Sequence, residues 1–214
     1  ILTVSKGLTE VFDRNKNVHW VPNGVDIDFF ESAIKSTMNN NQKTVVGYVG
    51  KIQDRVDFNL VEKCLNNFPK CHFEFLGPIY TQHERIKIIE EKYDNIHFSG
   101  DVHYARLPSA MKNFDVAIIP HKIDAFTDSM NPLKLYEYLA AGKLVVTTGV
   151  AGTDNISPYV YTASNESKFL EYLHQAIDKV DGQNIDYFEI VNSIPEECTW
   201  SNRVRVILDL FNDL

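Results

Sequence analysis

The stretch Asn131-Pro-Leu-Lys-Leu-Tyr-Glu137-Tyr-Leu-Ala-Ala-Gly142-Lys-Leu-Val-Val146 joins a helix pattern directly to a strand pattern. Asn131 suits the N-cap position, Pro132 suits the first helical position, and Gly142 marks the end of the helix. The apolar run Leu144–Thr148 follows after a short turn and is typical of a buried strand. A helix that leads into such a strand is one unit of a wound α/β layer.

The same alternation continues on both sides of this unit. The predicted strands are Thr44–Val49, Cys71–Leu76, Asn95–Phe98, Phe114–Ile119, Leu144–Thr148 and Tyr159–Tyr161. The predicted helices between them are Val56–Phe68, Glu84–Tyr93, Leu107–Asn113, Pro132–Ala141 and Glu166–Val180. Strands that alternate with crossover helices predict an α/β fold with a Rossmann-like parallel sheet.

The ends of the chain differ in character from this layer. Ile1-Leu-Thr-Val-Ser5 reads as the end of a strand that enters a helix, without an initiator Met, so we expect a fragment of a longer protein. Thr199 can cap a helix whose apolar stripe must pack on something. The predicted division is residues 1–30, the tail of another domain; 31–42, a linker; 43–198, the Rossmann-like domain; and 199–214, a terminal helix.

The composition limits the classes of function. The 214 residues are 44% hydrophobic and 23% charged, which excludes disordered, collagen-like and coiled-coil chains. Lys and Arg number 21 against 29 Asp and Glu, a net charge of −8, and the basic residues are dispersed, so we expect no nucleic-acid partner. No apolar run reaches membrane-span length. Three cysteines without CxxC spacing fit reduced thiols in the cytoplasm.

Ligands of an open parallel sheet bind outside the carboxyl ends of its strands. Gly50, Lys51 and Arg55 follow the first predicted strand. A glycine lets a ligand approach the backbone, and two cations suit a diphosphate. The segment is neither a GxGxxG nor a Walker motif, so a glycine turn with solvated charges is the alternative. After the third strand, His103 or Tyr104 could stack on a base.

The helix that begins near Asn131 is the strongest candidate site. Its N-terminus lies at the carboxyl edge of the sheet, where a positive dipole end and unpaired amides favour a phosphate. Lys134 and Glu137 are three residues apart and share a face. A carboxylate one turn behind a phosphate site suits the paired hydroxyls of a ribose. The alternative is a surface ion pair worth a few tenths of a kcal/mol.

Metal and nucleophile motifs are absent from the sequence. Asp26-Ile-Asp28 mimics a metal-binding DxD pair, but it precedes the predicted sheet. The seven histidines have no HxxxH or HExxH spacing, and there is no GxSxG motif. We therefore expect no bound metal and no cofactor.

Five segments in order resemble the carboxy-terminal domain of GT-B glycosyltransferases of family 4, in a branch found in bacterial polysaccharide and teichuronic acid synthesis. They are Val21-Pro-Asn-Gly-Val-Asp26, Gly47-Tyr-Val-Gly50-Lys51, Phe98-Ser-Gly-Asp-Val102, Phe114-Asp-Val-Ala-Ile-Ile-Pro120 and Asn131 to Lys143. The resemblance covers nearly the whole chain. It implies one half of a two-domain architecture, in which the carboxy-terminal domain binds the nucleotide sugar and the missing amino-terminal domain binds the acceptor.

The resemblance also implies roles for single residues. Lys51 and Arg55 would contact the donor diphosphate, the backbone of Val102 would meet the base, and Glu137 would hold the ribose. The expected donor-binding residues are Gly50, Lys51, Arg55, Val102, His103, Tyr104, Met130, Asn131, Pro132, Leu133, Lys134 and Glu137. The family pattern places a first acid at position 129, where this chain has Ser129 beside Asp128. Both are the expected catalytic contacts to the donor sugar: either Asp128 substitutes for the acid or this branch manages without it.

The implied activity is transfer of a sugar from a nucleotide-diphosphate sugar, with a UDP-sugar expected, to a glycan or lipid-linked acceptor. Retention of configuration, independence of metal and a cytoplasmic location at the inner face of the membrane are further expectations, as are peripheral membrane association of the full-length protein and inactivity of the isolated fragment. Ser129 keeps open the alternative of a nucleotide-binding or interaction module without transferase activity. An epimerase of the same overall fold is disfavoured, because its acids and histidines cannot be placed.

Overall fold

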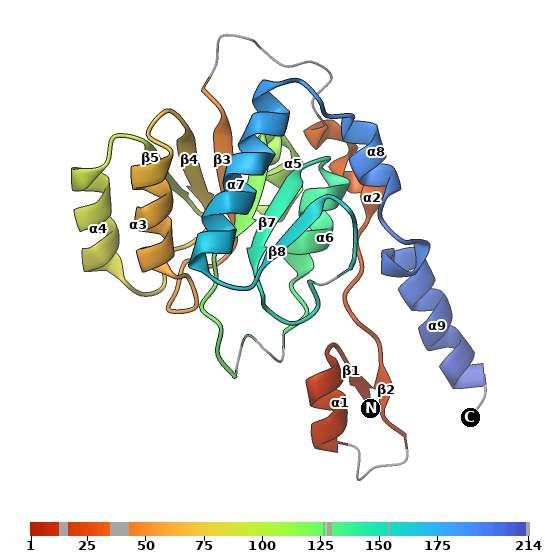
Figure 1. Ribbon diagram of the computed structural model, residues 1–214. Coiled ribbons are helices and arrows are strands. Elements are labelled where there is room, and N and C mark those ends of the chain that lie inside the picture. The colour runs from red at the N-terminus through yellow and green to blue at the C-terminus, as the bar shows by residue number, and fades with distance from the viewer. Residues whose placement is uncertain (13–16, 35–42, 126, 128–129, 154, 213–214) are drawn as a thin grey trace.

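The computed structural model describes residues 1–12, 17–34, 43–125, 127, 130–153 and 155–212 (Figure 1). Its centre is a six-stranded sheet in the order β5-β4-β3-β6-β7-β8. The strands are β3 (Val45–Val49), β4 (His72–Leu76), β5 (Ile96–Gly100), β6 (Val116–Ile119), β7 (Leu144–Thr148) and β8 (Val160–Ala163). All neighbouring strands run parallel, which confirms the predicted Rossmann-like α/β fold.

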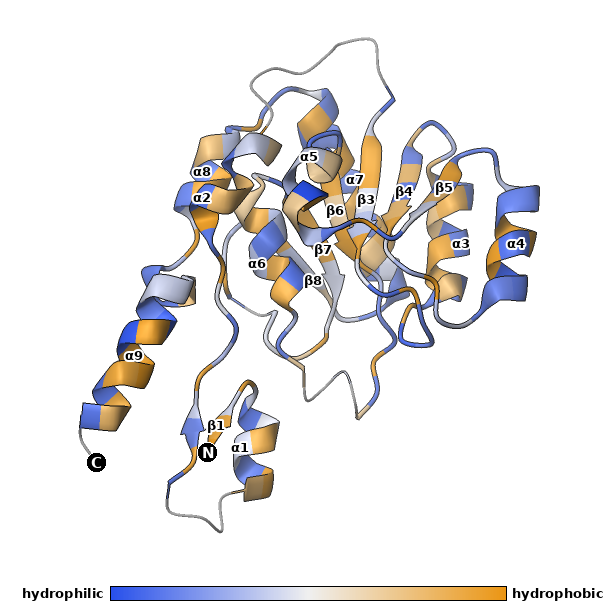
Figure 2. Ribbon diagram, turned by 180° about the vertical axis from the view of Figure 1, so that it is seen from behind, coloured by the Kyte–Doolittle hydropathy of each residue, from blue (hydrophilic) through white to orange (hydrophobic). Residues whose placement is uncertain are grey.

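Helices cover both faces of the sheet. They are α3 (Phe58–Asn67), α4 (His83–Lys92), α5 (Leu107–Met111), α6 (Leu133–Ala140) and α7 (Glu166–Asp181). Helices α3, α4 and α7 lie in front of the sheet in Figure 1, and α5 and α6 lie in front of it in the opposite view of Figure 2. Because both faces are covered, β6 and β7 are buried along their whole length, as continuous apolar runs in a parallel sheet require.

The predicted strands and helices are confirmed, with small shifts at their ends. The largest shift at a strand start is at β6, which begins at Val116 and not at Phe114. Asp115 is joined to Val45 by two hydrogen bonds: its backbone N–H donates to the Val45 carbonyl (2.8 Å), and its carboxylate accepts from the Val45 N–H (2.8 Å). The Phe114 ring packs against Gly47, where a Cβ atom would lie 2.0 Å from the ring. The turn before β6 is thus fixed by contacts with β3.

The described residues 1–12 and 17–20 form a small unit beside the sheet domain. Strands β1 (Leu2–Thr3) and β2 (His19–Trp20) pair in parallel, and α1 (Lys6–Phe12) lies against them. The predicted strand end and helix at the start of the chain are therefore confirmed. The next elements are α2 (Ile27–Phe30), which packs against α6, and η1 (Glu31–Ala33).

Asp26 of the DxD sequence has a local structural role. Its carboxylate accepts a hydrogen bond from the backbone of Phe29 (3.2 Å) and caps α2. In the described part of the chain, no group of three His, Cys, Asp or Glu side chains is arranged to hold a metal ion. Nor does that part contain a helix with the length and apolar character needed to cross a membrane.

The last elements are α8 (Tyr187–Asn192), which the sequence did not predict, η4 (Glu196–Cys198) and α9 (Trp200–Asn212). Thr199 caps α9 as predicted, because its hydroxyl accepts a hydrogen bond from the backbone of Asn202 (3.2 Å). No described residue of α9 is buried, so its apolar stripe, visible in Figure 2, is uncovered. The expectation that this stripe packs against something is not met within the described chain.

Candidate functional site

The candidate site lies where the order of the sheet reverses. Strands β3 and β6 are neighbours, but the chain continues from β3 to β4 on one side and from β6 to β7 on the other. Such a point leaves a crevice at the carboxyl ends of the two strands. Gly50 follows β3, His121 follows β6 after one residue, and α6 begins beside them.

Lys134, in the first turn of α6, points its amine at the end of β3. Only 9% of Lys134 is exposed. Its Nζ atom donates a hydrogen bond to the Tyr48 hydroxyl (3.0 Å), and Nε2 of His121 lies at 3.4 Å. The same Nζ lies 4.3 Å from the centre of the Tyr48 ring. The amine is thus held by one residue of β3 and one residue that follows β6.

Gly50 permits this arrangement. Its φ angle of +136° is one that other residues rarely adopt, and an added Cβ atom would lie 2.7 Å from Nζ of Lys134. Gly77, which follows β4, lies equally close to the carbonyl of Gly50, because a Cβ atom added at Gly77 would lie 2.1 Å from that oxygen. The two glycines let neighbouring strand ends approach closely. Gly50 is therefore required by contacts within the protein, and the approach of a ligand to its backbone stays a prediction.

The site is rich in buried positive or potentially positive groups. Burial lowers the pKa of Lys134 well below 10.5, the nearby charge of Arg55 lowers it further, and Glu137 partly offsets both. Burial lowers the pKa of His121 to about 2, with further lowering by Lys134 and Arg55. Nε of Arg55 and Nδ1 of His121 are buried without a hydrogen-bond partner among the described residues. An anion is the kind of ligand that such a cluster would accept.

Glu137 lies one turn further along α6 and is 6% exposed. Burial raises the pKa of its carboxyl group, while a hydrogen bond from Tyr104 and the charge of Lys134 act in the opposite direction. Lys134 and Glu137 are both buried, and no salt bridge joins them. The alternative of a surface ion pair for these two residues is therefore wrong.

The loop after β5 comes close to Glu137. The Tyr104 hydroxyl donates to Glu137, and the Tyr104 ring stacks on Phe29 with centroids 5.0 Å apart and planes 5° apart. His103 caps the 3-10 turn η2 (Tyr104–Arg106), because its Nδ1 accepts from the backbone of Ala105 (3.3 Å). Val102 is half-buried against the core. The loop and the helix thus meet at Glu137, with Tyr104 against the carboxylate and against Phe29, and the stacking of His103 or Tyr104 on a base stays a prediction.

The other predicted residues are distributed around this cluster. Lys51 is exposed, with its amine 5.3 Å from the centre of the Tyr80 ring, and Arg55 is half-buried. Met130, on the segment that leads into α6, and Leu133, the first residue of α6, are half-buried. Asp128 and Ser129 lie outside the described residues.

The predicted start of α6 is wrong by one residue. Pro132, and not Asn131, occupies the N-cap position, the first helical residue is Leu133 and not Pro132, and no side chain caps the helix. The side-chain oxygen of Asn131 instead accepts a hydrogen bond from the backbone of Asn23 (2.9 Å), and the Asn23 side chain donates to the Asn131 carbonyl (2.7 Å). Asn131 therefore joins the start of α6 to the segment before α2 by hydrogen bonds.

Tyr48 and His121, which both contact the amine of Lys134, have no role in the prediction from sequence. His121 has one usable signal, because it follows β6 at the ligand-binding edge of the sheet. Tyr48 has none, because an aromatic residue within a predicted strand is expected in the core. It is fully buried, and burial raises the pKa of its hydroxyl to about 12.

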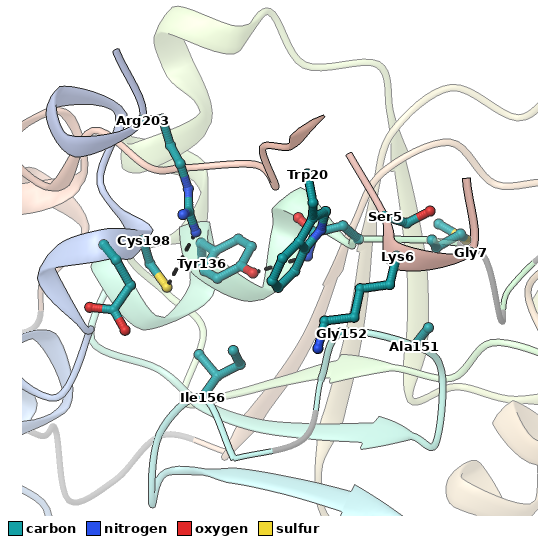
Figure 3. A pocket seen from close by; sticks show the side chains of 13 residues that line it. Ser5, Lys6, Gly7, Trp20, Tyr136, Ala151, Gly152, Ile156, Cys198 and Arg203 are labelled. Carbon is teal, nitrogen blue, oxygen red and sulfur yellow. Dashed lines mark hydrogen bonds between the residues drawn. The ribbon is translucent and has the colours of Figure 1, made fainter. Parts of the chain in front are cut away.

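A cavity of about 440 Å³ lies beside the segment 130–131, between the sheet domain and the part of the chain that holds Ser5, Lys6, Gly7 and Trp20 (Figure 3). The Lys6 amine lies 4.8 Å from the centre of the Trp20 ring, and Arg203 donates to the backbone of Asn23 (3.4 Å). The lining residues are Ser5, Lys6, Gly7, Trp20, Met130, Asn131, Tyr136, Ala151, Gly152, Ile156, Glu197, Cys198 and Arg203. Aromatic, charged and amide side chains in one cavity suit a polar ligand that carries a ring.

Two kinds of solved structure share this fold at low sequence identity. Anabaena HepE in complex with UDP is 14% identical with a TM-score of 0.77, over 100% of this chain and 63% of that chain. A mutant of S. aureus TarM in complex with fondaparinux, α-GlcNAc-glycerol and UDP is 15% identical with a TM-score of 0.73, over 99% of this chain and 43% of that chain. These likenesses show the fold.

Sequence comparison is more specific. The chain is 29% identical over 200 residues to TuaH of Bacillus subtilis (strain 168), named for teichuronic acid biosynthesis as a glycosyltransferase. The match covers 90% of this chain and 50% of the relative, so the chain spans about half the length of that protein. The family model described as glycosyl transferases group 1 matches residues 43–179, which contain every strand of the six-stranded sheet. The chain therefore belongs to the glycosyl transferases group 1 family.

Proposed function

We propose that this chain is the donor-binding half of a glycosyltransferase that moves a sugar from a nucleotide-diphosphate sugar to an acceptor hydroxyl. The observation that supports this proposal best is the burial of Lys134 and Glu137 at the switch point of the sheet. Burial of a lysine and a glutamate without a shared salt bridge is costly for a fold. A ligand with an anionic part and a hydroxyl-bearing part would give both groups a partner.

The roles follow from the arrangement of the cluster. The diphosphate would lie against the close approach at Gly50, where Lys134, Arg55 and the first amides of α6 face it. Lys51 would act from the exposed rim. These groups would stabilise the charge that grows on the diphosphate as the sugar leaves, without a metal ion.

The nucleoside would extend from the diphosphate toward β5. Glu137 would accept hydrogen bonds from the ribose hydroxyls, after Tyr104 releases its own bond to that carboxylate. The backbone of Val102 would meet the base. We propose a UDP-sugar as donor, supported by the UDP bound in the HepE and TarM structures.

For the acceptor, we propose a glycan or lipid-linked glycan, because the relative TuaH is named for the synthesis of a polymer. The cavity beside Trp20 is lined by the segment 130–131 and by Tyr136 of α6, so an acceptor there would lie close to the donor sugar. Retention of configuration and action in the cytoplasm at the inner face of the membrane belong to the same proposal. The free thiols of Cys64, Cys71 and Cys198 are compatible with a reducing compartment.

A thermal-shift screen of this chain against UDP, GDP, ADP, CMP and dTDP tests donor binding. A nucleotide at about 100 times its Kd adds about 2.7 kcal/mol to the free energy of unfolding, so UDP should raise Tm measurably. Absence of any shift at millimolar nucleotide would contradict the proposal. Assay of the full-length protein with UDP-sugars then separates transfer from binding without turnover, which is the prediction of the interaction-module alternative.

A further inference from the structure

Nζ of Lys134 has two hydrogen-bond partners among the described residues, which is the number that the two N–H groups of an uncharged amine can serve. A neutral amine has two N–H groups and one lone pair, whereas an ammonium group has three N–H groups. Two acceptors lie near Nζ: the Tyr48 oxygen at 3.0 Å and Nε2 of His121 at 3.4 Å. His121 can accept there in its neutral form, with the ring proton on Nδ1, which is the buried nitrogen without a described partner.

The charges around this amine also disfavour an ammonium group. The groups that face it are Tyr48 on β3, Arg55 in the loop after β3, His121 after β6 and Glu137 on α6 itself. Arg55 is a second cation in the same cluster. Glu137 is the single carboxylate among these groups, and it accepts a hydrogen bond from Tyr104. Among the described residues, no carboxylate forms a salt bridge with Lys134, and Glu137 only partly offsets the effects of burial and of Arg55.

We propose that Lys134 is uncharged in the ligand-free site and takes up one proton when a nucleoside diphosphate binds, with Tyr48 and His121 as the residues that position its amine. This inference rests on the proposed function, because it needs the diphosphate at this edge of the sheet. The incoming anion favours the ammonium form, whose third N–H can then donate to a phosphate oxygen. The lowered pKa of Lys134 is consistent with this protonation change.

Calorimetric titration of this chain with UDP, in several buffers of different ionisation enthalpy at about pH 8, measures the proton uptake. UDP contributes no proton there, because the second pKa of a phosphate group is about 6. The binding enthalpy of the wild type should vary linearly with the buffer ionisation enthalpy, with a slope near one proton taken up. Lys134→Arg should bind UDP with a slope of zero, because its guanidinium group is always charged.

Further variants keep the test decisive. If the larger arginine prevents folding, Lys134→Met serves in its place. This variant should bind UDP at least tenfold more weakly than the wild type, with a slope of zero. Lys168→Arg, an exposed lysine on α7, should retain the wild-type slope. His121→Gln keeps a hydrogen-bond acceptor and should retain both slope and affinity, whereas His121→Leu and Tyr48→Phe should weaken UDP binding several-fold.

The outcomes distinguish this inference from the proposed function. A wild type that binds UDP with a slope of zero would overturn proton uptake and leave donor binding intact. A wild-type slope in Lys134→Arg or Lys134→Met would assign the proton to another group and overturn the role of Lys134. Equal losses of affinity in His121→Gln and His121→Leu would show that His121 is a structural residue. No binding of UDP at millimolar concentration would overturn the proposed function itself.

Discussion

Two helices of this protein carry the same Lys-x-x-Glu spacing in opposite environments. On α7, Lys168 and Glu171 form an ion pair of 2.8 Å with side chains 45% and 48% exposed. On α6, Lys134 and Glu137 are buried, and each has a partner from another part of the chain: Tyr48 for the lysine and Tyr104 for the glutamate. The spacing alone therefore does not distinguish a surface pair from a binding site.

The difference arises from where each helix begins. Helix α6 starts at the carboxyl edge of the sheet beside β3 and β6, so its first turn points into the crevice of the switch point. Helix α7 follows the edge strand β8, begins at the exposed cap Asn165, and places this pair in solvent. The α7 pair is thus an internal control for every test of the α6 pair.

The largest expected difference is between Lys134→Met and Lys168→Met. Loss of a charged hydrogen bond to the diphosphate should weaken UDP binding by about 1.5–3 kcal/mol, or roughly 10- to 150-fold, in Lys134→Met. Lys168→Met should bind UDP like the wild type, because an exposed pair contributes tenths of a kcal/mol and lies elsewhere. Calorimetric titration measures both. Equal affinity of the two variants would remove Lys134 from the site.

Gly50→Ala should destabilise the fold more than Gly100→Ala. Both glycines have positive φ angles, +136° and +74°, so each substitution introduces backbone strain of about 1–3 kcal/mol. At Gly100 an added Cβ atom meets no atom within 4 Å, whereas at Gly50 it would lie 2.7 Å from Nζ of Lys134. Urea unfolding measures the stability of both variants. UDP titration should show weakened UDP binding for Gly50→Ala. Matching losses of stability with wild-type affinity in both would mean that the amine moves aside freely.

Glu137→Gln and Glu171→Gln compare the buried carboxylate on α6 with the exposed carboxylate on α7. If Glu137 accepts hydrogen bonds from the ribose, the preference for UDP over 2′-deoxy-UDP should fall by about 1 kcal/mol, or roughly fivefold, in Glu137→Gln. The preference should stay unchanged in Glu171→Gln. Competition binding with the two nucleotides measures the ratio. A retained ribose preference in Glu137→Gln would make that residue structural.

The smallest expected effect is a difference in pH dependence. The pKa of Lys134 is lowered by burial, so between this pKa and 10.5 the unfolded chain binds more protons, and stability rises with pH. Its slope is at most about 1.4 kcal/mol per pH unit. The pKa of Lys168 is raised, first by its hydrogen bond to Glu171, so its contribution falls as pH rises through that pKa. Urea unfolding of the wild type and the two Met variants should show the contribution of Lys134 below about pH 10.5, and the contribution of opposite sign from Lys168 only above about pH 10.5, the ordinary pKa of a lysine. A shared sign would contradict the burial argument.

The sequence was sufficient for most of the fold because its periodicity is local. The helix over α6 and the strand over β7 are marked by Pro132 and Gly142 at their boundaries, and the structure shifts these elements by at most one residue. Helix α8 was missed because its six residues are too few for a clear helical period.

The candidate site was only partly predictable. Lys134 and Glu137 could be found from their place after a strand. Tyr48 could not, because its contact with Lys134 joins residues 86 positions apart and depends on the register of β3. Asn131 was assigned to the N-cap because its actual partner, Asn23, is 108 positions away in the sequence. Local pattern therefore identified the edge of the sheet, and tertiary contacts determined the chemistry there.

The most direct test of donor binding at this edge is a titration of the ¹⁵N-labelled chain with UDP, followed by backbone amide chemical shifts. The largest shifts should occur at Gly50, Val102 and Lys134, with none at Lys168 on α7. Absence of shifts at millimolar UDP, or shifts confined to residues away from the carboxyl ends of β3, β5 and β6, would contradict the assignment of this edge as the donor site.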